Sequence, residues 1–344
     1  MSLESVLGQS HAVGMLRAAL ESGEIHHAYL FAGPTGVGKE LAAVAFAQAL
    51  ICQEPKPGCG KCSACLRVAK HAHPDVPWLM AEDEMISRGL AGRSDFASTP
   101  SREIKVEQIR SFQERIGLRA LEGTRKVAIV VGAEAMNPQA QNALLKTLEE
   151  PPADTVLILL TSAADHLLPT VRSRCSKVVF VPLPAALIAE QVQRQRNLDP
   201  ETSSLLAVLS GGSLLRALSF DTKRLADRKG LIELFERAST SVPALLKFAE
   251  TFGANRAQAE AALEVLDLWI RDLLVRKEQG ADLVNRDLDQ LAASASPKYS
   301  PARLHLMHQA LRRAREWIIE RNGAPRLQLE RMLIEMSGSH EHRA

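Results

Sequence analysis

The chain has 344 residues, of which 46% are hydrophobic and 24% charged, proportions of ordinary globular proteins that exclude a disordered or collagen-like chain. This length predicts two or three domains. The net charge of +2 is too small for capture of nucleic acid by charge alone, and 4% aromatic residues argue against a stacking platform for single strands. The first residues, Met1–Ser5, carry no pattern of a secretory signal, and no stretch reaches the roughly 20 apolar residues of a membrane span, so we expect a cytoplasmic protein.

Up to about Pro182, short β-rich runs alternate with helical patterns, which indicates an α/β domain with a mainly parallel sheet. The expected strands are Ala28–Ala32, Val76–Met80, Lys126–Val131, Thr155–Thr161 and Lys177–Val181. Residues 81–102 are rich in Glu, Asp, Ser and Gly and are predicted to form an exposed insertion. From Pro184 onward only helical periodicity is found, as in the apolar stripe between Ala262 and Leu273.

A glycine-rich loop follows the first expected strand and precedes the helical run Leu41–Leu50. Its glycines, Gly33, Gly36 and Gly38, let backbone N–H groups curl around an anion, and Lys39 adds a positive charge. The strand–loop–helix context favours a phosphate-binding loop over a simple turn before a helix.

Two parts of a Mg²⁺ site are missing from this loop and its surroundings. Glu40 occupies the position where the motif has a Ser or Thr hydroxyl that coordinates Mg²⁺. The strand Lys126–Val131 ends without an acid, and Glu134 comes later, in the turn. The sequence therefore predicts an ATPase scaffold without hydrolysis, and whether the loop still binds nucleotide stays open.

Four of the five cysteines lie within 14 residues, at Cys52, Cys59, Cys62 and Cys65. Four thiolates at this spacing satisfy tetrahedral Zn²⁺ and leave no open position, so the expected metal is structural. A cluster of free thiols and an iron–sulfur site are the alternatives, and the cytosolic context favours zinc.

The phosphate loop and the cysteines stand in a longer ordered set of motifs. The set comprises His26–Phe31 before the loop, the four cysteines, Asn142–Pro152, and Ser173-Arg174-Cys175. Together they resemble the bacterial clamp-loader subunits of the AAA+ class. The resemblance implies three domains: an AAA+ domain over 1–182 with a zinc module at 52–65, a helical lid over 183–225, and a helical collar over 226–344 that oligomerises into a ring. Glu40 and Val131-Gly132 are similar to the non-hydrolysing members.

The resemblance also implies roles for single residues. Arg174 would reach the γ-phosphate of ATP held by a neighbouring subunit, a task that suits a guanidinium because it stays charged and binds phosphate in a bidentate manner. An arginine paired with a local carboxylate is the simpler alternative. Thr161 or Ser162 ends the fourth expected strand, where the family has a polar sensor residue, or it only caps that strand. Arg216 would belong to a second sensor, with Ser213 as the cap of its helix.

The partners implied are clamp-loader subunits of the gamma/tau and delta types, the sliding clamp, and primed DNA reached through the assembly. No catalysis is expected from this chain alone, which would be a component of the DNA-directed DNA polymerase holoenzyme, with ATP bound by partner subunits. An ATP-hydrolysing motor subunit of the gamma/tau type is the alternative. A free-standing zinc module for nucleic acid is disfavoured, because Lys61, Arg67 and Lys70 are too few for an electrostatic footprint.

Overall fold

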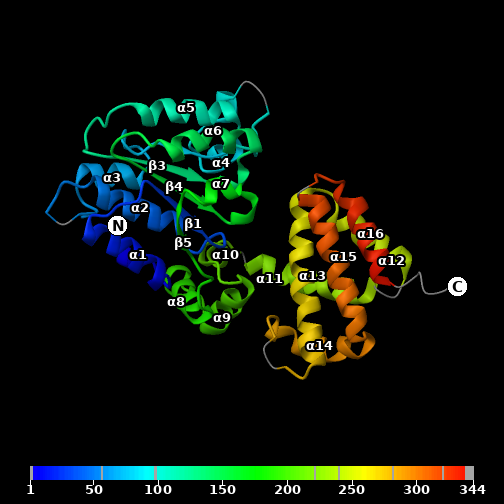
Figure 1. Ribbon diagram of the computed structural model, residues 1–344. Coiled ribbons are helices and arrows are strands. Elements are labelled where there is room, and N and C mark those ends of the chain that lie inside the picture. Colours follow the sequence, from blue (N-terminus) through cyan, green and yellow to red (C-terminus); the bar gives the residue numbers. More distant parts are fainter. Residues whose placement is uncertain are drawn as a thin grey trace. The chain divides into compact units, whose positions relative to one another are not determined.

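A computed structural model describes residues 3–55, 57–96, 99–220, 222–238, 241–280, 283–319 and 321–337, with only the backbone of 222–226 and 238 (Figure 1). The chain forms two compact units. One consists of Met1–Gln195 with Ser210–Arg216, and the other of Arg196–Leu209 with Ala217–Ala344. Helix α11 begins at Thr222, so the boundary predicted between 225 and 226 falls within its first turns. The division into three domains stays a prediction.

The described residues of the first unit contain a five-stranded parallel sheet in the order β2-β3-β4-β1-β5. The predicted bounds of β1 (Ala28–Ala32), β3 (Lys126–Val131) and β4 (Thr155–Thr161) are confirmed at both ends. These three strands lie in the middle of the sheet, and nearly all of their side chains are buried. Continuous burial on both faces explains why they form unbroken apolar runs in the sequence.

The two edge strands differ from their predicted bounds. Strand β2 is only Trp78–Leu79, and the preceding Pro77 cannot donate to a ladder. Strand β5 is Ser176–Val179, shorter at its end than the prediction. Beyond β5, the N–H of Val181 donates to Gln9 Oε1 at 3.0 Å, and Gln9 Nε2 donates to the Val181 carbonyl at 2.7 Å. A side chain thus replaces a strand neighbour at this edge.

Helices cover both faces of the sheet (Figure 1). The helices of this unit are α1 (Ser10–Ser22), α2 (Lys39–Ile51), α3 (Ser63–Ala69), α4 (Glu82–Ser87), α5 (Val106–Gly117), α6 (Pro138–Glu149), α7 (Pro169–Arg172) and α8 (Ala185–Arg196). Alternate strand residues such as Leu30 and Leu159 pack with Phe112 of α5 and Leu144 of α6. On the other face, Tyr29 meets Phe46 of α2 edge-on at 5.2 Å. The described residues of the predicted insertion, 81–96 and 99–102, include α4 and a 3-10 turn at Arg93–Asp95.

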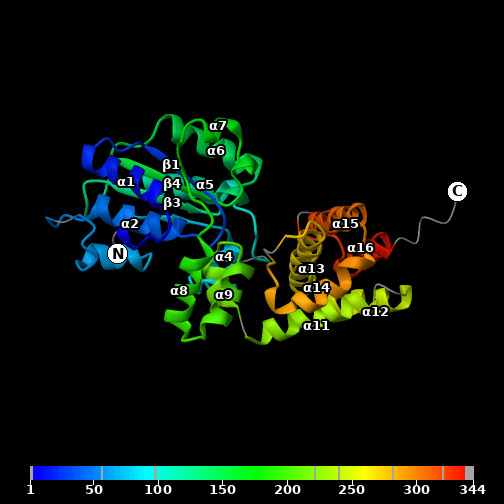
Figure 2. The same cartoon turned by 90° about the horizontal axis from the view of Figure 1, so that it is seen from below.

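The second unit is helical. Its helices are α9 (Pro200–Leu209), α11 (Thr222–Ala238), α12 (Val242–Phe252), α13 (Arg256–Lys277), α14 (Asp289–Ala295), α15 (Pro301–Ile319) and α16 (Pro325–Ser337), and α10 (Leu214–Ser219) runs from the first unit into it. In Figure 2, α11 and α12 lie along one side of α13, α15 and α16. Among the described residues from Pro184 onward no strand is present, as predicted. No described helix has both the length and the apolar composition of a membrane span.

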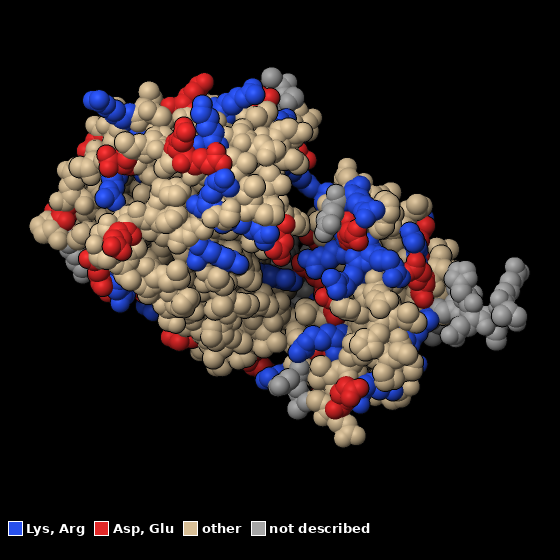
Figure 3. All heavy atoms as spheres, in the orientation of Figure 1, with Lys and Arg blue, Asp and Glu red and all other residues tan. Residues whose placement is uncertain are grey.

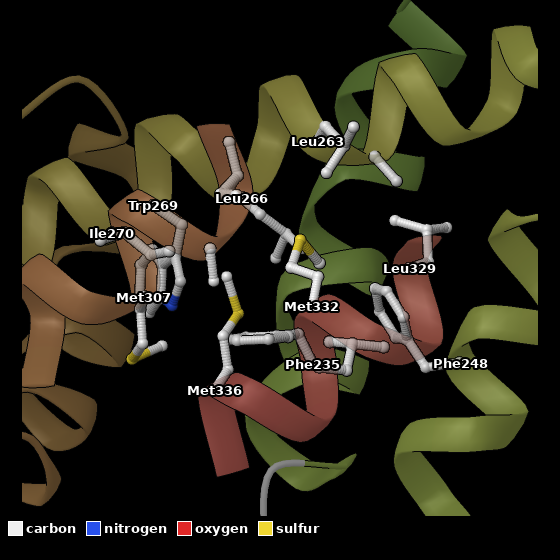
Figure 4. Packing of buried hydrophobic residues seen from close by; sticks show 14 of the residues in the cluster. Phe235, Phe248, Leu263, Leu266, Trp269, Ile270, Met307, Leu329, Met332 and Met336 are labelled. Atoms are coloured by element: carbon white, nitrogen blue, oxygen red, sulfur yellow. The ribbon is translucent and has the colours of Figure 1, made fainter. Parts of the chain in front are cut away.

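The core of this unit is formed by the stripe predicted between Ala262 and Leu273, which packs with Phe235, Phe248 and Met332 (Figure 4). Within the stripe, Trp269 is fully buried and Val265 is only partly buried. Trp269 donates its indole N–H to Glu236 Oε1 at 2.8 Å, so its polar atom is satisfied inside the core.

The carboxylate of Asp272 holds the segment that follows α13 against this core. It is fully buried and accepts hydrogen bonds from the backbone N–H groups of Val284 (2.8 Å) and Asn285 (2.7 Å), and from the Asn285 side-chain amide at 2.6 Å.

We expect Asp272→Ala to lower the free energy of unfolding by about 3 kcal/mol, because three buried donors lose their acceptor. Urea unfolding followed by circular dichroism measures this change. Asp267→Ala is the control, since Asp267 lies on the same helix, is 36% exposed and pairs with His308. Its cost should stay below about 1 kcal/mol. Equal losses for both variants would contradict the role of Asp272.

Candidate functional site

The lysine of the glycine-rich loop is turned back onto the loop itself. Lys39 Nζ donates to the carbonyl oxygens of Gly33 at 2.5 Å and Pro34 at 2.6 Å. Burial lowers the pKa of Lys39, and the nearby Glu134 opposes that effect. The charge that the motif would offer to a phosphate is thus engaged by the loop's own carbonyl groups.

The segment Ser210–Arg216 of the same unit packs on the loop at Gly36. The N–H of Leu215 donates to the Gly36 carbonyl at 3.4 Å, and a Cβ built on Gly36 would lie 2.2 Å from Ser213 Oγ. Gly33 is as confined, because a Cβ there would lie 2.1 Å from the carbonyl oxygen of Phe180. The segment predicted to be a second sensor therefore packs directly on the loop, and two of the loop glycines are required by close approach of other residues.

Glu40 is held by charged and aromatic residues from two other segments. Its Oε1 accepts a hydrogen bond from Arg88 Nη1 at 2.7 Å and lies 3.6 Å from His71 Nε2. Arg88 Nε also donates to Glu84 Oε1 at 2.7 Å. Burial is the main cause that lowers the pKa of His71, which favours the neutral ring at pH 7. Arg88 is therefore the permanent cation beside Glu40.

Thr161 is confirmed as the end of β4, where its hydroxyl accepts the N–H of Ala163 at 3.1 Å. The next residue, Ser162, donates its hydroxyl to Glu134 Oε1 at 2.5 Å and its N–H to the same oxygen at 3.1 Å. Burial would raise the pKa of Glu134, but the bonds from Ser162 and Thr161 lower it overall, so this carboxylate stays charged. Thr161 thus acts as a strand cap, and a sensor role for it stays a prediction.

Arg174 follows α7 and is partly exposed. Its Nη2 pairs with Glu149 Oε1 at 2.6 Å, and its Nη1 donates to the Thr170 carbonyl at 2.9 Å. This is the local pairing that the sequence offered as the simpler alternative. The side chain is nevertheless 36% exposed, so the guanidinium remains accessible from solvent.

The predicted helix cap before Arg216 is present. Ser213 Oγ accepts the N–H of Arg216 at 3.2 Å, at the start of α10. Arg216 itself is half-buried. A capped helix that packs on the phosphate loop accounts for the local sequence, and a nucleotide-sensing role of Arg216 stays a prediction.

The four clustered cysteines come together as their spacing predicts. They lie at the end of α2, in the turn that follows and at the start of α3. Their four Sγ atoms all lie within 4.8 Å of one another. The distances Cys52 Sγ–Cys62 Sγ and Cys59 Sγ–Cys65 Sγ are 3.9 and 4.0 Å. A tetrahedron with metal–sulfur bonds of about 2.3 Å has sulfur–sulfur edges of about 3.8 Å, so the cluster fits a four-thiolate metal site.

The surroundings of the cysteines shift their pKa values in opposite directions, so some thiols ionise more readily than others. The N–H groups of Lys61 and Cys62 donate to Cys59 Sγ and lower the pKa of Cys59 to about 6. Burial raises the pKa of Cys65 to about 12 in the metal-free chain. A metal would therefore have to displace protons from the cluster as it binds.

On the visible face of this unit, acidic and basic side chains intermingle, which gives no support to a basic nucleic-acid surface there (Figure 3).

A parallel sheet with its phosphate loop after β1, helices on both faces and a helical continuation define an AAA+ chain, as the sequence predicts. Family models described as "DNA polymerase III, delta subunit" and its C-terminal part match residues 8–184 and 222–338. The chain is 42% identical to DNA polymerase III subunit delta′ of Pseudomonas aeruginosa over 195 aligned residues. The aligned residues are 56% of this chain and 54% of that relative. It is 30% identical to the Escherichia coli subunit delta′, over 90% of this chain and 88% of the relative. The chain belongs to the delta-prime family of DNA polymerase III subunits.

A more distant relationship links the chain to subunit tau of Escherichia coli. The two are 29% identical over 306 residues, which are 87% of this chain and 44% of that subunit. The similarity to a subunit of the gamma/tau type keeps that alternative open, and the absence of hydrolysis stays a prediction.

Three groups of residues at the site were not found from the sequence. They are Arg88 with Glu84, which face Glu40; Glu149, which faces Arg174; and Leu215, which covers Gly36. Glu149 lies inside the motif Asn142–Pro152, but nothing in its spacing indicates a partner 25 residues away. Arg88 lies in a segment whose polar composition predicts only a loop.

Proposed function

We propose that the chain is a non-hydrolysing clamp-loader subunit of the cytoplasm, a component of the DNA polymerase III holoenzyme. It assembles with subunits of the gamma/tau and delta types into the ring that loads the sliding clamp on primed DNA. ATP is held by partner subunits, and Arg174 contributes to the site of a neighbour. The observation that carries the proposal is the self-occupied loop, in which Lys39 bonds carbonyl groups and Glu40 is neutralised by Arg88.

A hydrolysing P-loop needs a free lysine for the phosphates and a metal held by a hydroxyl and a strand-end acid. Here Lys39 is bonded within the loop, Glu40 replaces the hydroxyl, and β3 ends at Val131 without an acid. These three departures affect different parts of the same reaction. Their combination favours loss of hydrolysis over adaptation of a single contact.

We expect the isolated chain to show no ATP turnover above background, in the presence of Mg²⁺, primed DNA and clamp. The measurement is phosphate release from the unmodified chain beside Lys39→Ala, which should give the same baseline. Turnover that disappears in Lys39→Ala would instead support the motor subunit of the gamma/tau type.

The ring is tested separately by mixing the chain with purified gamma/tau-type and delta-type subunits and measuring the mass of the intact assembly. A defined complex that contains this chain is expected. Its absence at micromolar concentrations would contradict the assembly role, whatever the outcome of the ATPase measurement.

We also propose that the metal at the four cysteines is Zn²⁺. Thiolate ligands in a closed tetrahedral set suit Zn²⁺, and with four protein ligands it would supply structure and no chemistry. Cys52, Cys59, Cys62 and Cys65 would tie the end of α2 to the start of α3.

A further inference from the structure

We propose that Arg88 takes the place of the divalent cation at the phosphate loop and, through Glu40, fastens α4 to the start of α2. The proposal rests on the proposed function, in which the loop does not use Mg-nucleotide. It gives the segment 82–88 a task that neither its composition nor the family assignment indicates. The segment would close the site with a cation that belongs to the chain itself.

Arg88 combines an i,i+4 pair to Glu84 with a pair to Glu40 in another segment. Its guanidinium bridges two carboxylates, with Nη1 to Glu40 and Nε to Glu84 at 2.7 Å each. Its side chain is 26% exposed and that of Glu40 is 34% exposed, so both are shielded in part from water. A charge-assisted bond in such a place is stronger than a fully exposed pair.

Glu40 stands at the position of the metal ligand in a working phosphate loop. The residue is the second of α2, at the N-terminal end where the hydroxyl of a working loop would meet Mg²⁺. The positive end of the helix dipole already favours a carboxylate there. Arg88 occupies that carboxylate, and a guanidinium carries its charge at every physiological pH.

A third segment completes the arrangement. His71, which follows α3, lies 3.6 Å from the same oxygen of Glu40, and its ring stacks on Trp78 at 4.0 Å. Glu40 is thus the point where the phosphate loop, the segment after α3 and α4 meet. The start of α2, directly after the loop, thus joins two other segments of the chain.

The test is limited proteolysis of the full chain by trypsin, with the cleavage rate after Arg93 as the readout. Arg93 lies beyond α4, in the turn Arg93–Asp95, and is cleaved when the segment opens. We expect Glu40→Gln and Arg88→Met each to raise this rate about tenfold or more, because cleavage follows the population of the open form and each variant removes a charged hydrogen bond. The double variant should be no faster than either single one.

Glu335→Gln in the helical unit is the matched control. It removes a carboxylate that is bonded by Arg313 at 2.6 Å and is 30% exposed, and it should leave cleavage after Arg93 unchanged. An unchanged rate in Glu40→Gln, or rates in the single variants that multiply in the double variant, would overturn the proposal. Neither result bears on ATP turnover, so failure here is distinct from failure of the proposed function.

Discussion

Replacing Cys62 by serine is expected to release the bound metal and unfold the module between α2 and α3. The four sulfur atoms lie within 4.8 Å of one another, an arrangement that suits four thiolates around one shared cation. Metal binding to such small modules contributes about 10–16 kcal/mol, which is effectively their folding free energy. Loss of one ligand should therefore lower the affinity by orders of magnitude.

Metal content by elemental analysis and thiol titration of the native chain measure this effect. The unmodified chain should hold about one Zn²⁺ and protect four thiols. Circular dichroism should change little, because only the seven residues of α3 depend directly on the module. Cys175→Ser is the control, since Cys175 lies outside the cluster and should leave the metal content intact. An unmodified chain without zinc, or with four freely reacting thiols, would contradict the prediction.

The parts of the fold that were predictable are those with local causes. Strands β1, β3 and β4 are buried on both faces, so their apolar runs begin and end where the strands do. The edge strands β2 and β5 have fewer neighbours, and a proline and the side chain of Gln9 decide their ends. Those contacts depend on tertiary placement, which periodicity does not contain.

The site divides in the same way. The glycine loop and the four cysteines are short motifs, so their spacing alone predicted that their members meet. The partners of Lys39, Glu40 and Arg174 were not predictable, because they are backbone carbonyls or carboxylates and guanidinium groups brought close by the fold. Arg88 lies 48 positions after Glu40 in the sequence, and the whole metal module lies between them. The loss of hydrolysis stays a prediction from the sequence, and the structure adds the contacts of Lys39 and Glu40.

Arg174→Ala is expected to lower DNA- and clamp-stimulated ATP hydrolysis of the complete assembly while leaving folding and assembly intact. An arginine supplied in trans contributes about 10³–10⁵ in rate in other phosphoryl-transfer systems. We expect about a 10³-fold loss at the neighbour's site. The steady-state rate of the ring should fall less, because its other ATP sites keep their own arginines.

The pairing of Arg174 with Glu149 at 2.6 Å makes this prediction sharper. A guanidinium that acts on a neighbour's phosphate must exchange this carboxylate for phosphate oxygens, so Glu149→Ala should preserve hydrolysis by the ring. If the pair is only structural, Arg174→Ala and Glu149→Ala should behave alike. Arg172→Ala is the control, since Arg172 is as exposed as Arg174 and pairs with Asp165 at 2.8 Å.

Arg174→Lys distinguishes charge from geometry. Lysine keeps the positive charge but lacks the planar fork that binds two phosphate oxygens at once, so it should restore little of the lost rate. If Arg174 contributed only its positive charge, Arg174→Lys should restore the ATP hydrolysis rate almost fully. If the alanine variant assembles and the ring hydrolyses ATP and loads clamps at the unmodified rate, then Arg174 serves only to hold Glu149 and the Thr170 carbonyl, and the role in trans is wrong.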